Sequence, residues 1–212
     1  MSRRRLYSTR CITASIALLL TTLVLPVPTP ALAGARLHPA LFALSTADFP
    51  VGSQLVRSGI ESNRQLFRDQ YLHFGRPPAA LGRRTGYYMD MVEGDPAAAS
   101  HAYTSYLVSI FRTQRQAEAA LDIRWNIWFA VAYYSTPAPA PISLGDAGTE
   151  ALFHTVDPSQ PPLSELFFQR GSILVEVFQG SVGIGSTNDQ LHSLWTIATE
   201  LDTLASQHPR GS

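Results

Sequence analysis

Four side chains could supply acid–base chemistry if the fold brought them together: Asp90, His101, His154 and Glu176. A carboxylate and an imidazole within hydrogen-bond reach of each other can act as general acid and base, which is enough for a hydrolase that needs no metal. The four are far apart in the sequence, and the six histidines show no metal-ligand spacing such as His-x-x-x-His. A metal-free hydrolase is therefore an alternative, while the sequence by itself predicts no catalytic residue and no metal site.

The one loop that resembles a cofactor site is the glycine-rich segment 180–187, between a predicted strand and a predicted helix. Gly180, Gly185 and Thr187 have the spacing of a phosphate-binding loop, but Ser186 stands where that loop needs lysine. Asn188 stands where a dinucleotide-binding loop needs its third glycine. The sequence also lacks a Gly-x-Ser-x-Gly nucleophile motif. We therefore expect no cofactor, and an enzyme is less favoured than a non-enzymatic protein.

Composition narrows the possible partners. The chain has 212 residues and no lysine, so its 16 basic residues are all arginine, against 16 acidic residues. Residues 34–212 contain 12 arginines and 16 acidic residues, a formal charge of −4. A mildly acidic domain is not suited to bind nucleic acid or anionic lipid, which attract clustered positive charge. The expected partner is a small molecule or a protein.

Residues 1–33 have the three parts of a signal peptide. A basic head, 1–10, precedes an apolar run, three prolines and the small-x-small pattern of Ala31-Leu32-Ala33. We expect export and cleavage after Ala33, by the general or the twin-arginine route. The alternative is an uncleaved helix and a membrane-tethered structural protein, the one case in which membrane contact would outlast export. Cleavage would remove Cys11, the only cysteine, and leave a chain without disulfides.

The rest of the chain is predicted to be one domain. Residues 34–50 form a lead-in segment, 51–206 a single α+β domain, and 207–212 a tail. Period-two alternation of apolar residues predicts strands, and apolar residues spaced three and four apart predict helices. The predicted strands are 51–58, 86–92, 102–111, 149–156, 165–169 and 172–179, and the predicted helices are 62–72, 114–133 and about 188–205.

Two stretches suggest a structural repeat. Ser105–Phe111 aligns with Ser172–Phe178, and each stretch follows one strand and precedes one helix. Strands joined by short loops pair antiparallel, and the helices then return to cover the sheet. The sequence thus predicts an antiparallel sheet of two similar hairpin-plus-helix units, with the helices packed on one face.

Several aromatic residues gather near the end of the second predicted helix: Trp125, Trp128, Phe129, Tyr133 and Tyr134. They could form a stacking patch for a sugar or another ligand. Trp125 and Trp128 also fit the buried stripe of that helix, and this favours the core for both.

Four short phrases resemble uncharacterised bacterial secreted or lipid-anchored domains of the PsbP-like or kinase-sensor-like kind. The phrases are Leu44–Pro50, Gly82–Tyr87, Leu144–Ala147 and Phe168–Val175. The resemblance implies an antiparallel sheet with covering helices, placed outside the cytoplasmic membrane, and it brings no catalytic residue with it. The chain differs from sensor domains that carry disulfides. The resemblance and the absence of catalytic and cofactor motifs together favour a secreted, non-enzymatic binding or accessory domain.

Overall fold

The computed structural model describes residues 37–69, 78–95, 101–130, 134–135, 140–155, 163–182 and 188–208. The chain divides into two units between Ala35 and Arg36, and every described residue belongs to the second unit. The predicted signal peptide and its cleavage site lie outside the described residues. Within the described part of the chain, no helix is both long enough and apolar enough to span a membrane.

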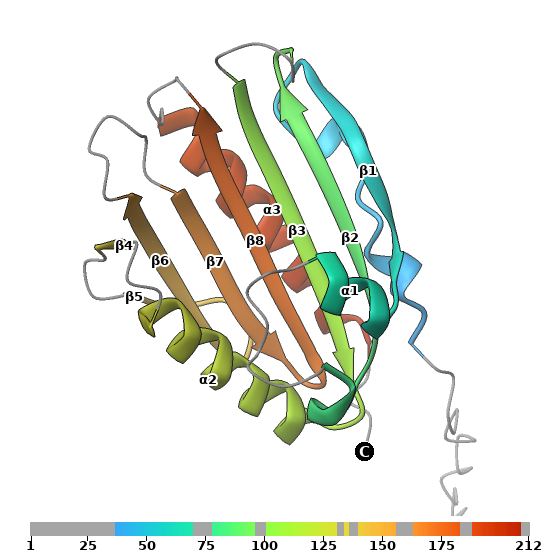
Figure 1. Ribbon diagram of the computed structural model, residues 1–212. Coiled ribbons are helices and arrows are strands. Elements are labelled where there is room, and N and C mark those ends of the chain that lie inside the picture. Colours follow the sequence, from blue (N-terminus) through green and yellow to red (C-terminus); the bar gives the residue numbers. More distant parts are fainter. Residues whose placement is uncertain are drawn as a thin grey trace, which may run out of the picture. The chain divides into compact units, whose positions relative to one another are not determined.

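The domain is built on one antiparallel sheet, as the sequence predicted (Figure 1). Across the sheet the strands are β1 (Ser53–Glu61), β2 (Arg83–Glu93), β3 (His101–Phe111), β8 (Ile173–Val182), β7 (Leu163–Arg170), β6 (Ala147–Thr155) and β4 (Tyr134–Ser135). The pair β3–β8 lies at the centre of the sheet, and the short strand β5 (Ala140–Ile142) also pairs with β6.

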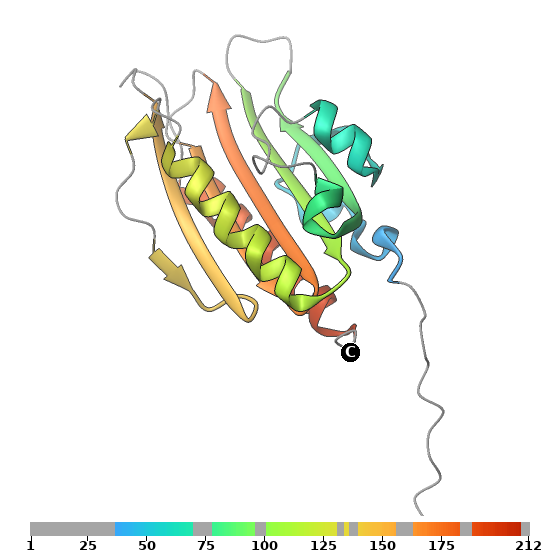
Figure 2. The same cartoon turned by 60° about the horizontal axis from the view of Figure 1, so that its bottom comes forward.

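The two long helices lie on opposite faces of this sheet, which corrects the prediction that the helices pack on one face. Helix α3 (Asn188–Ser206) packs on β7 and β8 from one side, and α2 (Gln114–Ala130) packs on β3, β7 and β8 from the other (Figures 1 and 2). We call these the α3 face and the α2 face. The physical reason is that the central strands are apolar on both faces, so both faces must be covered to exclude water.

The α3 face carries the larger part of the core. Leu194, Ala198, Leu201 and Ala205, which are spaced three and four apart in the last helix, are all buried there. They lie against alternate residues of the central strands, including Tyr106, Val108, Ile110, Val175 and Val177. Burying each large apolar side chain stabilises the fold by about 1.5 to 3 kcal/mol, so this stripe is a main source of stability.

Part of the lead-in segment also packs on the α3 face. Two short 3-10 helices, η1 (Pro39–Phe42) and η2 (Thr46–Asp48), place Phe42, Leu44 and Phe49 in the core. The hydroxyl of Tyr106 donates to the carbonyl of Phe42 at 2.6 Å and accepts from the backbone N–H of Leu44 at 3.1 Å. These two bonds fix the segment on the sheet.

The α2 face is covered by three helical elements of the described chain. These are α2, the short helix α1 (Asn63–Asp69) and the 3-10 helix η3 (Pro78–Leu81). Ala117, Ala120 and Leu121 of α2 are buried against β3, β7 and β8. Small alanine side chains let α2 approach the strands closely, which leaves little room for a cavity beneath it.

The two stretches of the predicted repeat lie side by side in the structure. Ser105 lies opposite Phe178 and Ile110 opposite Ile173, so β3 and β8 form the central antiparallel pair of the sheet. However, the helices that follow these strands lie on opposite faces. The structure therefore does not confirm two equivalent hairpin-plus-helix units.

Candidate functional site

The strand register places Asp90, His101 and Glu176 on the α2 face, but not next to one another. Asp90 lies opposite Ser105 in β3, and His101 is four residues further along β3, about 13 Å away along the strand. Glu176 is in β8, two strand spacings from Asp90, about 10 Å across the sheet. His154 lies in β6 opposite Ser135, and its side chain is outside the described part. The register thus brings no two of the first three side by side.

A buried arginine ion pair lies at the lower end of the α2 face. The guanidinium of Arg83 is fully buried, and its Nη2 contacts the carboxylate of Glu61 at 3.3 Å. Its Nε donates to the hydroxyl of Ser109 at 2.9 Å, and its Nη1 donates to the side-chain oxygen of Asn63 at 2.9 Å. Burial lowers the pKa of Arg83 to about 10, and the carboxylates of Glu61 and Glu176 oppose this decrease. Arg83 therefore stays charged at neutral pH and joins β1, α1 and β3.

Two local features make room for Arg83. The pairing of β2 with β3 shifts register between Arg83 and Thr85, and such a bulge re-aims the side chain at that position. Gly86 lies next to the guanidinium, and a Cβ at that position would overlap both the guanidinium and the carbonyl of Val108. The phrase Gly82–Tyr87 therefore contains both a structural arginine, Arg83, and the glycine that makes room for its guanidinium, Gly86.

A second polar cluster fixes the opposite side of the sheet. The guanidinium of Arg170 forms a two-pronged ion pair with Asp202 of α3, with Nη2 at 2.7 Å from Oδ2. Its pKa is raised, chiefly by the hydrogen bond to Asp202. The carboxylate of Asp146 accepts from the backbone N–H of Gly171 at 2.9 Å. Gly145, at φ +68°, passes so close to the β7 backbone that only glycine fits. The phrases Leu144–Ala147 and Phe168–Val175 therefore meet in one structural corner.

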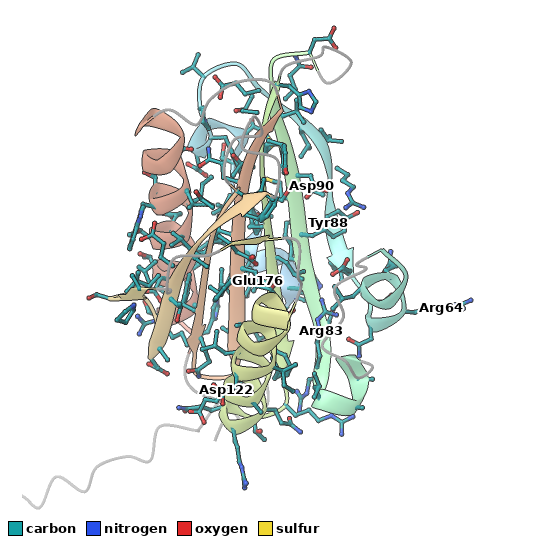
Figure 3. All side chains as sticks on the ribbon, turned by 60° about the vertical axis from the view of Figure 1, so that its left-hand side comes forward. Arg64, Arg83, Tyr88, Asp90, Asp122 and Glu176 are labelled. Carbon is teal, nitrogen blue, oxygen red and sulfur yellow. The ribbon has the colours of Figure 1, made fainter. Side chains whose placement is uncertain are left out.

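The upper part of the α2 face carries a different set of residues, which we call the two-tyrosine patch. Figure 3 shows Tyr88 and Asp90 on the same side of the sheet as α1 and α2, but above both helices in that view, while Arg64 of α1 points away from the sheet. The patch consists of six residues on β1, β2, β3 and β8: Arg57, Tyr88, Asp90, Tyr103, Ser105 and Phe178.

Both tyrosines of the patch lie against a glycine of the neighbouring strand. A Cβ at Gly180 of β8 would overlap the phenol end of Tyr103, so this ring lies across the β8 backbone. The ring also contacts Phe178, with centroids 5.6 Å apart. Tyr88 reaches in the other direction, toward Gly59 of β1, whose Cβ position is 4.0 Å from its ring. The two rings therefore lie along the sheet on either side of the β2–β3 pair.

Arg57 and Asp90 form the polar part of the patch. A register shift between Leu55 and Arg57 brings Arg57 opposite Asp90, and its Nε donates to the Asp90 carboxylate. The guanidinium carbon also lies 5.1 Å from the centroid of the Tyr88 ring, a cation–π distance. The carboxylate of Asp90 is thus held by a cation.

The patch is accessible, whereas the α2 face directly below it is not. The side chains of Arg57 and Asp90 are 55% and 22% exposed, and the other four patch residues are partly exposed. One step along the strands, Leu107 and Glu176 are buried. Of the six, sequence reasoning considered only Asp90 as a functional residue. The signal that could have found the tyrosines is a glycine inside a strand, because such a glycine often marks a close approach of another group.

Metal binding has no support in the described residues, in which no three or more His, Cys, Asp or Glu side chains gather in an arrangement that could hold an ion. The predicted aromatic group around Trp125 lies outside the described side chains.

The chain was compared with known proteins. No protein-family model matches it, and no curated protein matches it. Among solved structures it is similar to the extracellular domain of PknH from Mycobacterium tuberculosis, with a TM-score of 0.50 and 10% sequence identity. The match covers 77% of this chain and 94% of that domain. At this identity the similarity shows a common fold and transfers no residue role.

Proposed function

We propose that the protein is a secreted, non-enzymatic binding domain that uses the two-tyrosine patch to hold its ligand outside the cytoplasmic membrane. The observation that carries the proposal is the contrast within the α2 face. Its lower half is filled by a buried, internally paired arginine cluster, while its upper half presents aromatic rings and an ion pair to solvent. Partly exposed aromatic side chains with a few fixed polar groups are common at binding surfaces.

The arrangement of the predicted acid–base residues favours binding over hydrolysis. Asp90 is paired with Arg57, Glu176 is buried near Arg83, and His101 lies about 13 Å along the strand from the residue opposite Asp90. A general acid–base pair needs hydrogen-bond reach between its members.

Secretion is proposed from the signal peptide predicted at 1–33, with cleavage after Ala33. The shared fold with a solved extracellular domain supports this location. The charge of −4 for residues 34–212 supports a small molecule or a protein as partner, rather than nucleic acid.

Location and cleavage are tested together on the exported protein. A reporter enzyme that is active only outside the cytoplasmic membrane is fused to the C-terminus, and the intact mass of the unfused protein is measured after export. We expect an active reporter and a chain that begins at Gly34. An inactive reporter would refute secretion, and a chain that keeps residues 1–33 would instead support a tethered structural protein.

Binding is tested on the exported protein, labelled with nitrogen-15, against three classes of probe: oligosaccharides, short peptides and aromatic fragments. We expect at least one class to shift the backbone amide signals of Tyr88 and Tyr103 and to be recovered chemically unchanged. A folded protein whose patch signals respond to none of the three classes would refute the proposal. Probes recovered cleaved would support the hydrolase instead.

A further inference from the structure

We propose that the ligand of the two-tyrosine patch is a neutral oligosaccharide that lies along the sheet from Tyr88 to Tyr103. This inference rests on the proposed function, because it names the chemical class of ligand for the same surface. Three properties of the patch carry it: partly exposed aromatic rings, a polar centre without net charge, and an elongated form.

The aromatic rings favour contact with the face of a sugar ring. The phenol end of Tyr103 lies over Gly180 of β8, and Tyr103 is partly exposed. The guanidinium of Arg57 covers the ring of Tyr88, so we assign the stacking to Tyr103, with Tyr88 and Arg57 at the other end of the patch. The π face of an aromatic ring is electron-rich, and it attracts the C–H bonds on the face of a pyranose ring, which carry partial positive charge.

The polar centre favours a ligand without charge. Arg57 and Asp90 are already paired, so the patch offers donor and acceptor groups side by side with no net charge. A charged ligand would meet a cation and an anion side by side, so its attraction to one of them would be opposed by its repulsion from the other. Sugar hydroxyls both donate and accept, so they can bind to the pair and to the hydroxyl of Ser105 without breaking it.

The dimensions favour a chain of sugar units over a single small molecule. Tyr103 is four residues along β3 from Leu107, the partner of Tyr88, which separates the two rings by about 13 Å along the strand. The two side chains also lean in opposite directions, toward β8 and β1. The patch is partly exposed along this whole length, which suits a chain that passes over the surface.

Two other extended ligands fit the patch less well. A peptide that adds a strand needs unpaired backbone at a sheet edge, whereas Tyr88, Tyr103 and Phe178 belong to β2, β3 and β8, whose backbones are paired on both sides. Proline-rich peptides bind in grooves between neighbouring aromatic rings, whereas Tyr88 and Tyr103 are about 13 Å apart along the strands. A nucleic acid strand would also stack on the rings, but the charge of −4 repels it.

The test measures binding of the exported protein to an array of oligosaccharides that includes neutral, acidic and amino sugars, with a proline-rich peptide and single-stranded DNA as further probes. We expect one or more neutral oligosaccharides to bind, to shift the amide signals of Tyr88 and Tyr103, and to keep their affinity from low to high salt, since no charge is neutralised.

Variants then locate the site. Tyr103→Ala should weaken binding about tenfold or more, and Tyr103→Phe, which keeps the ring, should stay within about threefold of the wild type. Gly180→Ala should also weaken binding, because the added methyl group would overlap the phenol end of Tyr103, together with the side chain of Leu163 beside it, and would displace the ring. Arg84→Gln, at an exposed position on β2, is the matched control and should bind normally. Thermal unfolding of each variant confirms that it is folded.

The outcomes separate the ligand class from the binding function. Neutral sugars that bind with the expected variant effects support the proposal. If the peptide, the DNA or a charged sugar shifts the patch signals and neutral sugars do not, the ligand class is wrong and the binding surface stands. If neutral sugars bind but Tyr103→Ala and Gly180→Ala bind as the wild type does, the site is wrong. If no probe shifts the patch, both proposals fail.

Discussion

Replacing the buried Arg83 by methionine should destabilise the domain more than most single substitutions. Methionine keeps the apolar stem but removes the donors to Glu61, Asn63 and Ser109. Glu61 is 5% exposed, so its carboxylate would stay buried after losing its ion pair with Arg83, and Glu176 would lose the same positive charge. Breaking a buried ion pair from one side costs about 3 to 5 kcal/mol.

That loss is a large part of the 5 to 15 kcal/mol that a typical domain has in total. For a domain of this size it corresponds to a decrease in melting temperature of about 6 to 20 °C. The free energy of unfolding is measured by urea denaturation at pH 7, followed by tryptophan fluorescence. Arg84→Met, one residue further along the same strand at an exposed position, is the control and should change stability by less than about 0.5 kcal/mol.

A double variant tests the cause. Glu61→Gln in the Arg83→Met background removes the buried negative charge, so it should recover about 2 kcal/mol of the loss. The reasoning is refuted if Arg83→Met costs less than about 1 kcal/mol, or if the double variant is less stable than Arg83→Met by the full cost of Glu61→Gln alone, because the two residues would then act independently.

Three further predictions concern the other fixed points of the fold. Gly86→Ala should cost at least about 2 kcal/mol in the same urea assay, because its methyl group would overlap the guanidinium of Arg83. The pKa of Tyr106 is raised by burial, so the neutral phenol stabilises the folded state fully below about pH 10, and this stabilisation declines at higher pH. Above that pH, the free energy of unfolding of the wild type should therefore fall relative to that of Tyr106→Phe. Arg83, whose lowered pKa changes stability with pH in the opposite direction, contributes equally to both proteins. Asp202→Asn should lower the melting temperature by a few degrees, and less in high salt, because its ion pair with Arg170 is partly exposed.

The strands and helices could be predicted because their patterns are local. The alternation in 102–111 and 172–179 gave β3 and β8, and the apolar spacing from Leu194 to Ala205 gave the buried stripe of α3. The arrangement of the helices could not be predicted in the same way. Both faces of β3 and β8 are apolar, so the pattern says that each face is covered and does not say which helix covers which face.

The candidate site depends on register, which a local pattern does not contain. A shift between Leu55 and Arg57 decides that Arg57, and not Val56, lies opposite Asp90. A second shift turns Arg83 toward Glu61. Because a slip of one residue moves a side chain to the other face, neither ion pair could be inferred from spacing along the chain.

The four phrases compared above with secreted bacterial domains and the residues of the two-tyrosine patch are different parts of the sequence. Gly82–Tyr87 holds the buried arginine, Leu144–Ala147 and Phe168–Val175 meet around Arg170, and Leu44–Pro50 anchors on the hydroxyl of Tyr106. Each of these phrases fixes the fold, and none contains a residue of the patch. Proteins that share the phrases therefore share the reasons for folding in this way, but they are free to differ at the surface where the ligand would bind. It follows that the ligand must be sought by experiments on the patch itself, and that a ligand found for another domain of this fold would predict little about this one.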